Sequence, residues 1–181
     1  MEIKRLRKQL HKLDRASVVS LTERYRLSLI GFAFTYVRDE ATAEDVVSDA
    51  VVRLLVKTPR LRDERALKSY LFSATKNVAL DYLRKSKREK KGAEILASEQ
   101  TGADGLFENL LIKNERQRGL LTALAALNAD YREVLYLHYF EEMSVEETAK
   151  ATGRTKKQTY NLLARAKSAL AQILKKEDGM E

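Results

Sequence analysis

The sequence contains no cysteine and no tryptophan, and only one proline and two histidines occur among its 181 residues. Without cysteine, disulfide bonds and thiolate zinc sites are excluded. His11 and His138 are too few and too far apart along the chain to predict a catalytic or metal-binding cluster. No glycine-rich loop of the kind that binds phosphate is present. We therefore expect no enzymatic activity, no cofactor and no bound metal.

Long apolar runs are also missing. No stretch approaches the roughly 20 apolar residues that a membrane-spanning helix requires. The first residues, MEIKRLRKQLHKLDR, are charged throughout and lack the apolar segment of a signal peptide. These absences predict a cytoplasmic protein with no membrane insertion.

The residues that are abundant favour helices and packed cores. Ala, Leu, Lys, Arg and Glu are all good helix formers. Hydrophobic residues make up 44% of the chain and charged residues 33%, a balance that differs from that of disordered chains. The net charge of +8 indicates a polyanionic partner, although binding to a ribosome or a membrane surface would favour the same charge.

Hydrophobic periodicity predicts four helices in the first half of the chain. A basic amphipathic helix contains Ile3, Leu6, Leu10 and Leu13, and its basic face is either solvated or a binding arm. A largely buried helix follows at 21–37. The third, near AEDVVSDAVVRLL, is expected to open with a capping box formed by Thr42 and Asp45. A loop at 57–64 holds the only proline, and a fourth helix covers ALKSYLFSATKNVALDYLRKSK.

The composition changes after the fourth helix. The stretch KSKREKKGAEILASEQTGADG is first basic and then small and polar, with no sustained periodicity. The helical pattern returns at 106–126 and again at 131–140. We therefore predict an all-α fold of two small helical domains joined by a flexible linker, with a helix-turn-helix in the second. The predicted boundaries are 1–88, 89–110 for the linker, and 111–177.

The helix-turn-helix is predicted in SVEETAKATGRTKKQTYNLLARAKSAL. Ser144 with Glu147 and Thr155 with Gln158 both have capping-box spacing, and Gly153 supplies the stop between the two helices. One stripe of the second helix is expected to face inward: Thr159, Leu162, Leu163, Ala166, Leu170 and Ile173.

The opposite stripe of that helix carries basic, amide and small side chains. Lysine at a helix start can contact phosphate or guanine, and Asn or Gln can pair with adenine in the major groove. A small residue such as Ala164 lets the helix approach DNA closely. This pattern favours DNA binding over a merely solvated basic face.

The helix near AEDVVSDAVVRLL has one acidic side with an exposed valine. An acidic face would repel DNA, so it suits docking on another protein, although the pattern alone also fits a solvated face. On the fourth helix, Leu67, Leu71, Ala74, Val78 and Tyr82 are expected to face inward. Aromatic, amide and basic groups on its other side can stack and pair with an unpaired base. Phe72 either belongs to that group or packs on the preceding helices, and packing is preferred for Leu80 and Leu83.

Several segments, in this order, resemble one protein family. They are AEDVVSDAVVRLL, YLFSATKNVALDYLRK, YREVLYLHYFEEMSVEETA and RAKSAL. Together they resemble the extracytoplasmic-function branch of the bacterial sigma-70 family, whose members contain only sigma regions 2 and 4. The resemblance runs from about residue 21 to residue 174.

The resemblance implies a function and a set of sites. The chain would bind core RNA polymerase, recognise double-stranded promoter DNA and its melted non-template strand, and be held by an anti-sigma factor. The residues implied in core-polymerase binding are Glu44, Asp45, Ser48, Asp49 and Val52. Those implied at the minus-ten element are Arg60, Arg62, Lys76, Asn77, Arg84 and Lys85. Those implied at the minus-thirty-five element are Lys156, Lys157, Gln158, Tyr160, Asn161 and Arg165.

The chain also departs from the family pattern. Ser48 stands where glutamine is usual, Val51 where phenylalanine is, and Tyr70 where tryptophan is. On the recognition helix, Leu162 replaces an arginine, which removes a phosphate contact. These departures bear on the promoter sequence and not on the class of protein.

Two other functions remain open at the level of the sequence. A helix-turn-helix regulator would bind a two-fold DNA site without polymerase, its front domain serving for dimerisation or ligand binding. A polymerase-sequestering protein would keep the acidic docking face and need no recognition helix. The acidic face argues against the regulator, and so does the fourth helix, whose side chains can stack and pair with an unpaired base.

Overall fold

The computed structural model describes residues 13–90, 119–120 and 123–179. Within these ranges its helices are α2 (Arg15–Val37), α3 (Glu40–Lys57), α4 (Glu64–Lys90), α7 (Ala129–Leu135), the π-helix η1 (Tyr136–Phe140), α8 (Val145–Thr152) and α9 (Lys156–Asp178). The all-α prediction is confirmed. The predicted N-terminal helix, apart from Leu13, lies outside the described residues, as do most of the predicted linker and of the helix predicted at 106–126.

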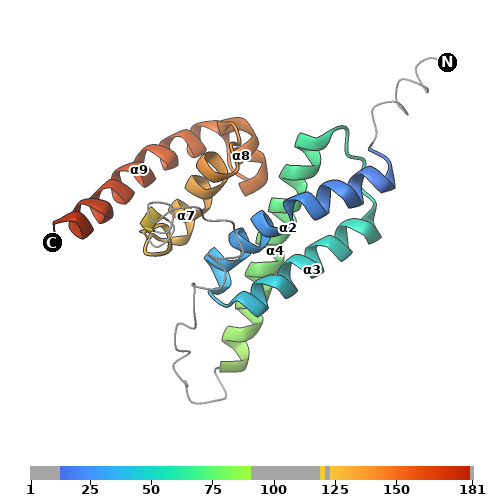
Figure 1. Ribbon diagram of the computed structural model, residues 1–181, viewed down its shortest axis with the longest axis horizontal. Coiled ribbons are helices and arrows are strands. Elements are labelled where there is room, and N and C mark those ends of the chain that lie inside the picture. The colour runs from blue at the N-terminus through green and yellow to red at the C-terminus, as the bar shows by residue number, and fades with distance from the viewer. Residues whose placement is uncertain (1–12, 91–118, 121–122, 180–181) are drawn as a thin grey trace.

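Helices α2, α3 and α4 form a three-helix bundle (Figure 1). Its core is built from side chains such as Leu29, Phe32, Val47, Leu71 and Phe72, each at most 1% exposed. The rings of Phe32 and Phe72 meet edge to face, with centroids 5.2 Å apart. Phe72 therefore packs in the core, and of the two alternatives left open for it, base stacking is wrong.

The start of α3 differs from the sequence prediction. Helix α3 is capped by Asp39, whose carboxylate accepts the backbone N–H of Thr42 at 2.9 Å, so a capping box beginning at Thr42 is wrong. Asp39 precedes the helix and its carboxylate accepts both the N–H and the hydroxyl of Thr42, which leaves Thr42 inside the first turn. Those hydrogen bonds to the charged form lower the pKa of Asp39.

The connection between α3 and α4 runs over residues 58–63, as the proline predicted. Thr58 ends α3 in a left-handed conformation (φ 42°), and Asp63 accepts the N–H of Ala66 at the start of α4. Leu61 belongs to this loop, and its buried side chain anchors the loop on the bundle.

The C-terminal domain is made of α7, η1, α8 and α9 (Figure 1). The helix predicted at 131–140 is present, and its second half widens into a π-helix that the sequence did not predict. This wider turn stacks Tyr136 on Phe140, with ring centroids 5.3 Å apart and nearly parallel planes. The Tyr136 hydroxyl then donates to the carbonyl of Ser28 on α2 at 2.9 Å.

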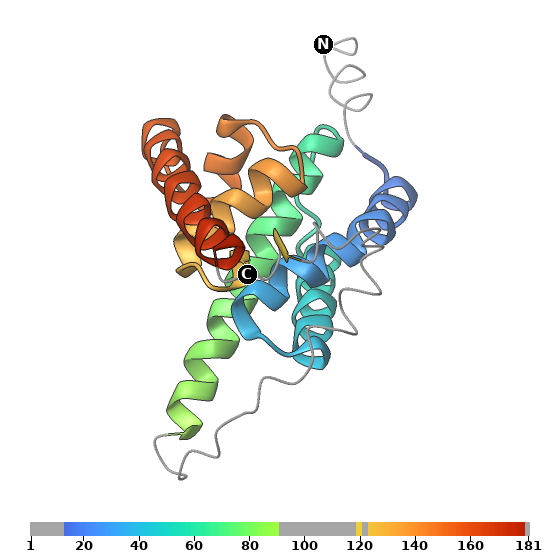
Figure 2. The same cartoon turned by 60° about the vertical axis from the view of Figure 1, so that its left-hand side comes forward.

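The two domains pack against each other. Tyr136, Leu137, Met143 and Ala151 from the C-terminal domain belong to the same buried cluster as the core of the three-helix bundle. The main contact is between α4 and α8. In both views α9 lies on the far side of the C-terminal domain from α3 (Figures 1 and 2).

Candidate nucleic-acid interface

A pair of reciprocal hydrogen bonds caps the start of the recognition helix α9. The backbone N–H of Gln158 donates to the Thr155 hydroxyl at 3.1 Å, and the N–H of Thr155 donates to the Gln158 side chain at 3.0 Å. Ser144 and Glu147 cap α8 in the same way. Both predicted capping boxes are confirmed, and they fix the two helices of the helix-turn-helix.

The two stripes of α9 also lie as predicted. Thr159, Leu163 and Ala166 are buried, while Leu162, Leu170 and Ile173 pack partly buried against the second core. The predicted minus-thirty-five residues are all exposed: Lys156, Lys157, Gln158, Tyr160, Asn161 and Arg165. Tyr160 is 67% exposed, a large value for an aromatic ring. This side of α9 is free to meet a DNA groove.

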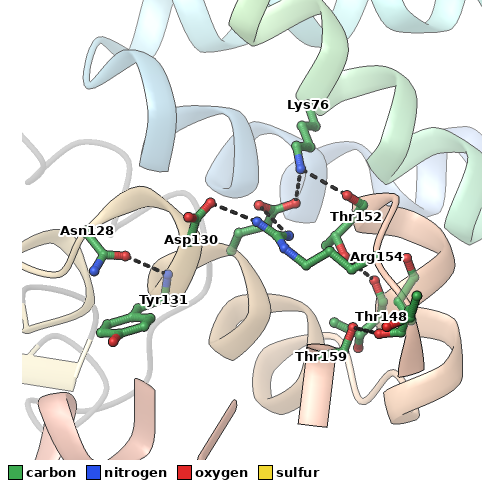
Figure 3. Close-up of polar contacts among 11 residues, drawn as sticks. Lys76, Asn128, Asp130, Tyr131, Thr148, Thr152, Arg154 and Thr159 are labelled. Carbon is green, nitrogen blue, oxygen red and sulfur yellow. Dashed lines mark hydrogen bonds and ion pairs between the residues drawn. The ribbon is translucent and has the colours of Figure 1, made fainter. Parts of the chain in front are cut away.

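The turn between α8 and α9 depends on Gly153 and Arg154. Gly153 has φ 71°, the left-handed conformation that ends a helix, and the N–H of Arg154 donates to the carbonyl of Ala149. The Arg154 side chain pairs with Asp130 at 2.7 Å and with Glu133 at 3.2 Å (Figure 3). These ion pairs join the turn to α7 and orient the start of the recognition helix.

The acidic side of α3 is exposed as predicted. Its members are Glu44, Asp45, Ser48, Asp49 and Val52. Val52 is 56% exposed, and Val56, one turn further along the same helix, is 76% exposed. An apolar strip beside carboxylates on a solvent-facing helix is typical of a protein-docking surface.

The predicted minus-ten residues divide into two groups. Arg60, Arg62, Asn77, Arg84 and Lys85 are exposed. Lys76 is not: its side chain is 16% exposed because the C-terminal domain covers it. Tyr82, expected to face inward, is 44% exposed and Leu83 is 37% exposed, because the C-terminal half of α4 extends beyond the bundle (Figure 2). The inward prediction for Tyr82 is therefore wrong, and so is the packing preferred for Leu83.

Lys76 takes part in a buried charge cluster between the domains. Its ammonium lies 2.7 Å from a carboxylate oxygen of Glu133 and donates to the carbonyl of Thr152 at 3.2 Å (Figure 3). Glu133 is 1% exposed and has Arg154 on its other oxygen. One carboxylate thus pairs with a cation from each domain.

A second buried pair lies further toward the start of α4. Lys68 is 3.5 Å from the carboxylate of Glu141 and also donates to its backbone carbonyl. Burial raises the pKa of Glu141, and the positive charge of Lys68 offsets only part of that effect. Arg65 and Glu147 add a solvent-exposed pair at 3.7 Å, of a kind worth little energy.

Among the residues that the structure describes, no His, Asp and Glu side chains gather in a group that could hold a metal ion. None of the helices in those ranges combines the length and the apolar character needed to cross a bilayer.

Two family models match this chain. Residues 21–89, which include α3, the loop and nearly all of α4, match Sigma-70 region 2. Residues 117–170, which include α7, η1, α8 and most of α9, match Sigma-70, region 4. The chain belongs to the sigma-70 family.

Relatives and solved structures agree with that assignment. RNA polymerase sigma factor SigV of Bacillus subtilis is 25% identical over 165 residues, covering 91% of this chain and 95% of the relative. ECF RNA polymerase sigma factor SigX of Bacillus subtilis is 28% identical, covering 72% of this chain and 70% of the relative. The predicted extracytoplasmic-function branch is confirmed.

The fold is shared with a sigma factor solved in a complex. RpoE of Bartonella quintana, bound to the anti-sigma factor NepR, superposes with a TM-score of 0.66 at 22% identity, over 89% of this chain and 96% of that one.

The residues that join regions 2 and 4 in this sigma-70 family member were missed by the sequence prediction. Glu133 sits in the apolar run YREVLYL, and a lone carboxylate in such a run signals a buried ion that needs partners. Its partners Lys76 and Arg154 are distant in sequence, so no local pattern identifies them. Lys68 and Glu141 carried no signal of this kind.

Replacing Gly153 tests the turn of the helix-turn-helix. An added Cβ would meet no atom within 4 Å, so any cost comes from the positive φ rather than from crowding. We expect Gly153→Ala to lower the free energy of unfolding by about 1–2 kcal/mol, measured by urea denaturation. Gly153→Asn should cost less, because asparagine tolerates the left-handed region. Equal losses for the two variants, or no loss for alanine, would contradict this account of the turn.

Proposed function

We propose that this chain is an RNA polymerase sigma factor that binds core polymerase and directs promoter recognition and transcription initiation. The observation that carries the proposal is the pairing of two exposed surfaces of opposite character on domains matching sigma regions 2 and 4. One is the acidic side of α3, and the other is the basic and amide side of α9.

The acidic side of α3 docks on core polymerase in this proposal. Exposed carboxylates such as Asp45 and Asp49 give charge complementarity to a basic protein surface. The exposed side chains of Val52 and Val56 supply apolar area that becomes buried on docking. DNA would be repelled by the same face, which supports a protein as its partner.

The outer side of α9 contacts the minus-thirty-five element as duplex DNA. Lys156 and Lys157 at the helix start suit phosphate or guanine, and Gln158 and Asn161 suit adenine. Ala164 is exposed and small, so the helix backbone can approach the groove. Tyr160 projects from the centre of this surface.

The minus-ten element meets the loop before α4 and α4 itself. Arg60 and Arg62 lie in the loop, and Asn77 lies on the exposed side of α4. Arg84 and Lys85 follow on the half of α4 that extends beyond the bundle. Opening about ten base-pair steps costs on the order of 14 kcal/mol at roughly 1.4 kcal/mol per step. Stacking on protein returns about 1–3 kcal/mol per captured base, so the chain must act together with core polymerase.

The partners follow from this role. The working protein binds core RNA polymerase, duplex promoter DNA and the melted non-template strand, and acts in the cytoplasm where these are found. Because RpoE of Bartonella quintana was solved with an anti-sigma factor, we include an anti-sigma factor among the partners of this chain. The domain boundaries remain those predicted, with region 2 in 1–88 and region 4 in 111–177 on either side of a linker at 89–110.

Transcription with purified components tests the proposal. The protein is added to bacterial core polymerase free of sigma factors, with fragmented genomic DNA as template. We expect new transcripts whose start sites share two spaced upstream elements. Binding of the protein alone to a symmetric duplex site, with no transcripts from a core that a known sigma factor activates, would instead support the helix-turn-helix regulator.

Charge reversal on α3 separates docking from DNA binding. In the variant Asp45→Lys with Asp49→Lys, like charges replace complementary ones, so core binding and transcription should fall by at least about tenfold. Core binding is measured by titration of labelled protein. The matched control reverses Glu23 and Glu146, exposed carboxylates away from α3, and should keep core binding. Loss of core binding in both variants would mean that general charge, and not the α3 face, is responsible.

A further inference from the structure

We propose that Tyr160 and Ala164, on the outer side of α9, contact the 5-methyl group of a thymine in the minus-thirty-five element. The inference rests on the proposed function and deepens it, because it names a base that this helix selects. Tyr160 is then a specificity-determining residue, whereas the cations around it bind phosphate on any sequence.

The cap at the start of α9 limits which side chains can select a base. Gln158 suits adenine by its type of side chain, and a glutamine pairs with adenine through both its oxygen and its NH2 group. In this structure the side-chain oxygen of Gln158 accepts the backbone N–H of Thr155 at 3.0 Å. While this cap is intact, Gln158 orients the helix and cannot also form the adenine pair. Base selection therefore depends on residues further along α9.

Tyr160 and Ala164 form an apolar patch on the outer side of α9. They are four residues apart and are therefore neighbours on the helix surface. Both are exposed, and Tyr160 is 67% exposed. Lys157 lies three residues before Tyr160 and Asn161 follows it directly, and both are exposed as well. A ring and a methyl group thus lie together on a side of the helix that also carries a cation and an amide.

Thymine is the base that suits this patch. Its 5-methyl group is an apolar feature in the major groove, and methyl and aromatic side chains contact it there. The exposed amide of Asn161, next to the patch, suits the adenine of an A·T pair. The contact also removes apolar surface of the Tyr160 ring from water, which favours binding. The patch and the amide together therefore favour A·T pairs.

The hydroxyl of Tyr160 offers a different contact, because a phenol can donate to a phosphate oxygen. That contact would strengthen binding to every sequence equally. Lys156, Lys157 and Arg165 are exposed on the same helix and can bind phosphate. Ala164 has no polar side-chain atom, so its position one turn beyond Tyr160 favours the apolar contact. The two alternatives depend on different atoms of Tyr160, the ring carbons or the hydroxyl, and can be separated by experiment.

Replacement of thymine by deoxyuridine tests the proposal, because uracil differs from thymine only by the 5-methyl group. The full-length chain, alone and bound to core polymerase, first selects duplexes from a randomised pool. Each thymine of the selected upstream element is then replaced in turn, and the affinity is measured by titration. We expect one replacement to weaken binding about fourfold, the ratio that corresponds to burial of one methyl group. An element without thymine, or no effect of any replacement, would overturn the proposal.

Variants at Tyr160 show whether its ring contacts the methyl group. In Tyr160→Ala the ratio between the thymine and deoxyuridine duplexes should fall to near one, since the ring is gone. Tyr160→Phe loses only the hydroxyl and should keep the fourfold ratio. Tyr82→Ala removes another exposed ring, on α4, and is the matched control that should keep both the ratio and the affinity. A fourfold ratio that persists in Tyr160→Ala, or is lost in Tyr160→Phe, would overturn the role of the ring.

Circular dichroism identifies any variant that has unfolded. The deoxyuridine replacement changes only the DNA, so it tests the methyl contact on the parent protein whatever the variants do. The outcome is independent of the transcription experiment. Methyl-dependent binding without transcripts would refute the proposed function alone, and transcripts from promoters whose upstream element shows no methyl dependence would refute the role of Tyr160 alone.

Discussion

The arrangement of this protein depends on one buried carboxylate. Glu133 is almost fully removed from solvent, and ionised carboxylates are stable in such places only with cationic partners. Arg154 comes from the turn of the helix-turn-helix and Lys76 from α4 of region 2. The same side chain therefore orients the start of the recognition helix and joins that domain to region 2. If only one of these cations were present, one oxygen of the carboxylate would have no positive charge next to it.

Buried ion pairs define an arrangement more than they stabilise it. The cost of removing both ions from water offsets much of their attraction, so a pair such as Lys76–Glu133 specifies which surfaces meet without making separation prohibitive. Apolar contacts such as that of Tyr136 with Phe32 also stabilise the packing of the two domains.

Local patterns in the sequence were sufficient for local structure and for the surfaces built on single helices. The capping boxes at Ser144 and Thr155, the stop at Gly153 and the two stripes of α9 each depend on residues a few positions apart. The exposed acidic side of α3 follows from the same periodicity. The prediction failed where two local groups competed for one role, because Asp39 and not Thr42 caps α3. The π-helix that accompanies the stacking of Tyr136 on Phe140 is not visible in the periodicity of the sequence.

The contacts between the domains could not be predicted from the sequence, for a different reason. Lys76 and Glu133 lie far apart in sequence, and nothing around either one identifies the other. Periodicity placed Lys76 on the outer side of α4, but it could not show that another part of the chain covers that side. Tyr82 illustrates the converse: its spacing matches the inward stripe, yet α4 extends beyond the bundle there and Tyr82 stays 44% exposed among the described helices.

The distance between the two domains, with and without the Glu133 carboxylate, tests the central claim most directly. Because the chain has no cysteine, spin labels can be attached at Glu23→Cys on α2 and Ser168→Cys on α9, both exposed positions. Pulsed electron resonance then gives the distribution of distances between the labels. We predict one narrow distribution for the parent protein, at the distance seen in the structure, and a broader one for Glu133→Gln, which leaves Lys76 without its carboxylate. A broad distribution in the parent protein, or an unchanged one in Glu133→Gln, would contradict the role of this carboxylate in joining the two domains.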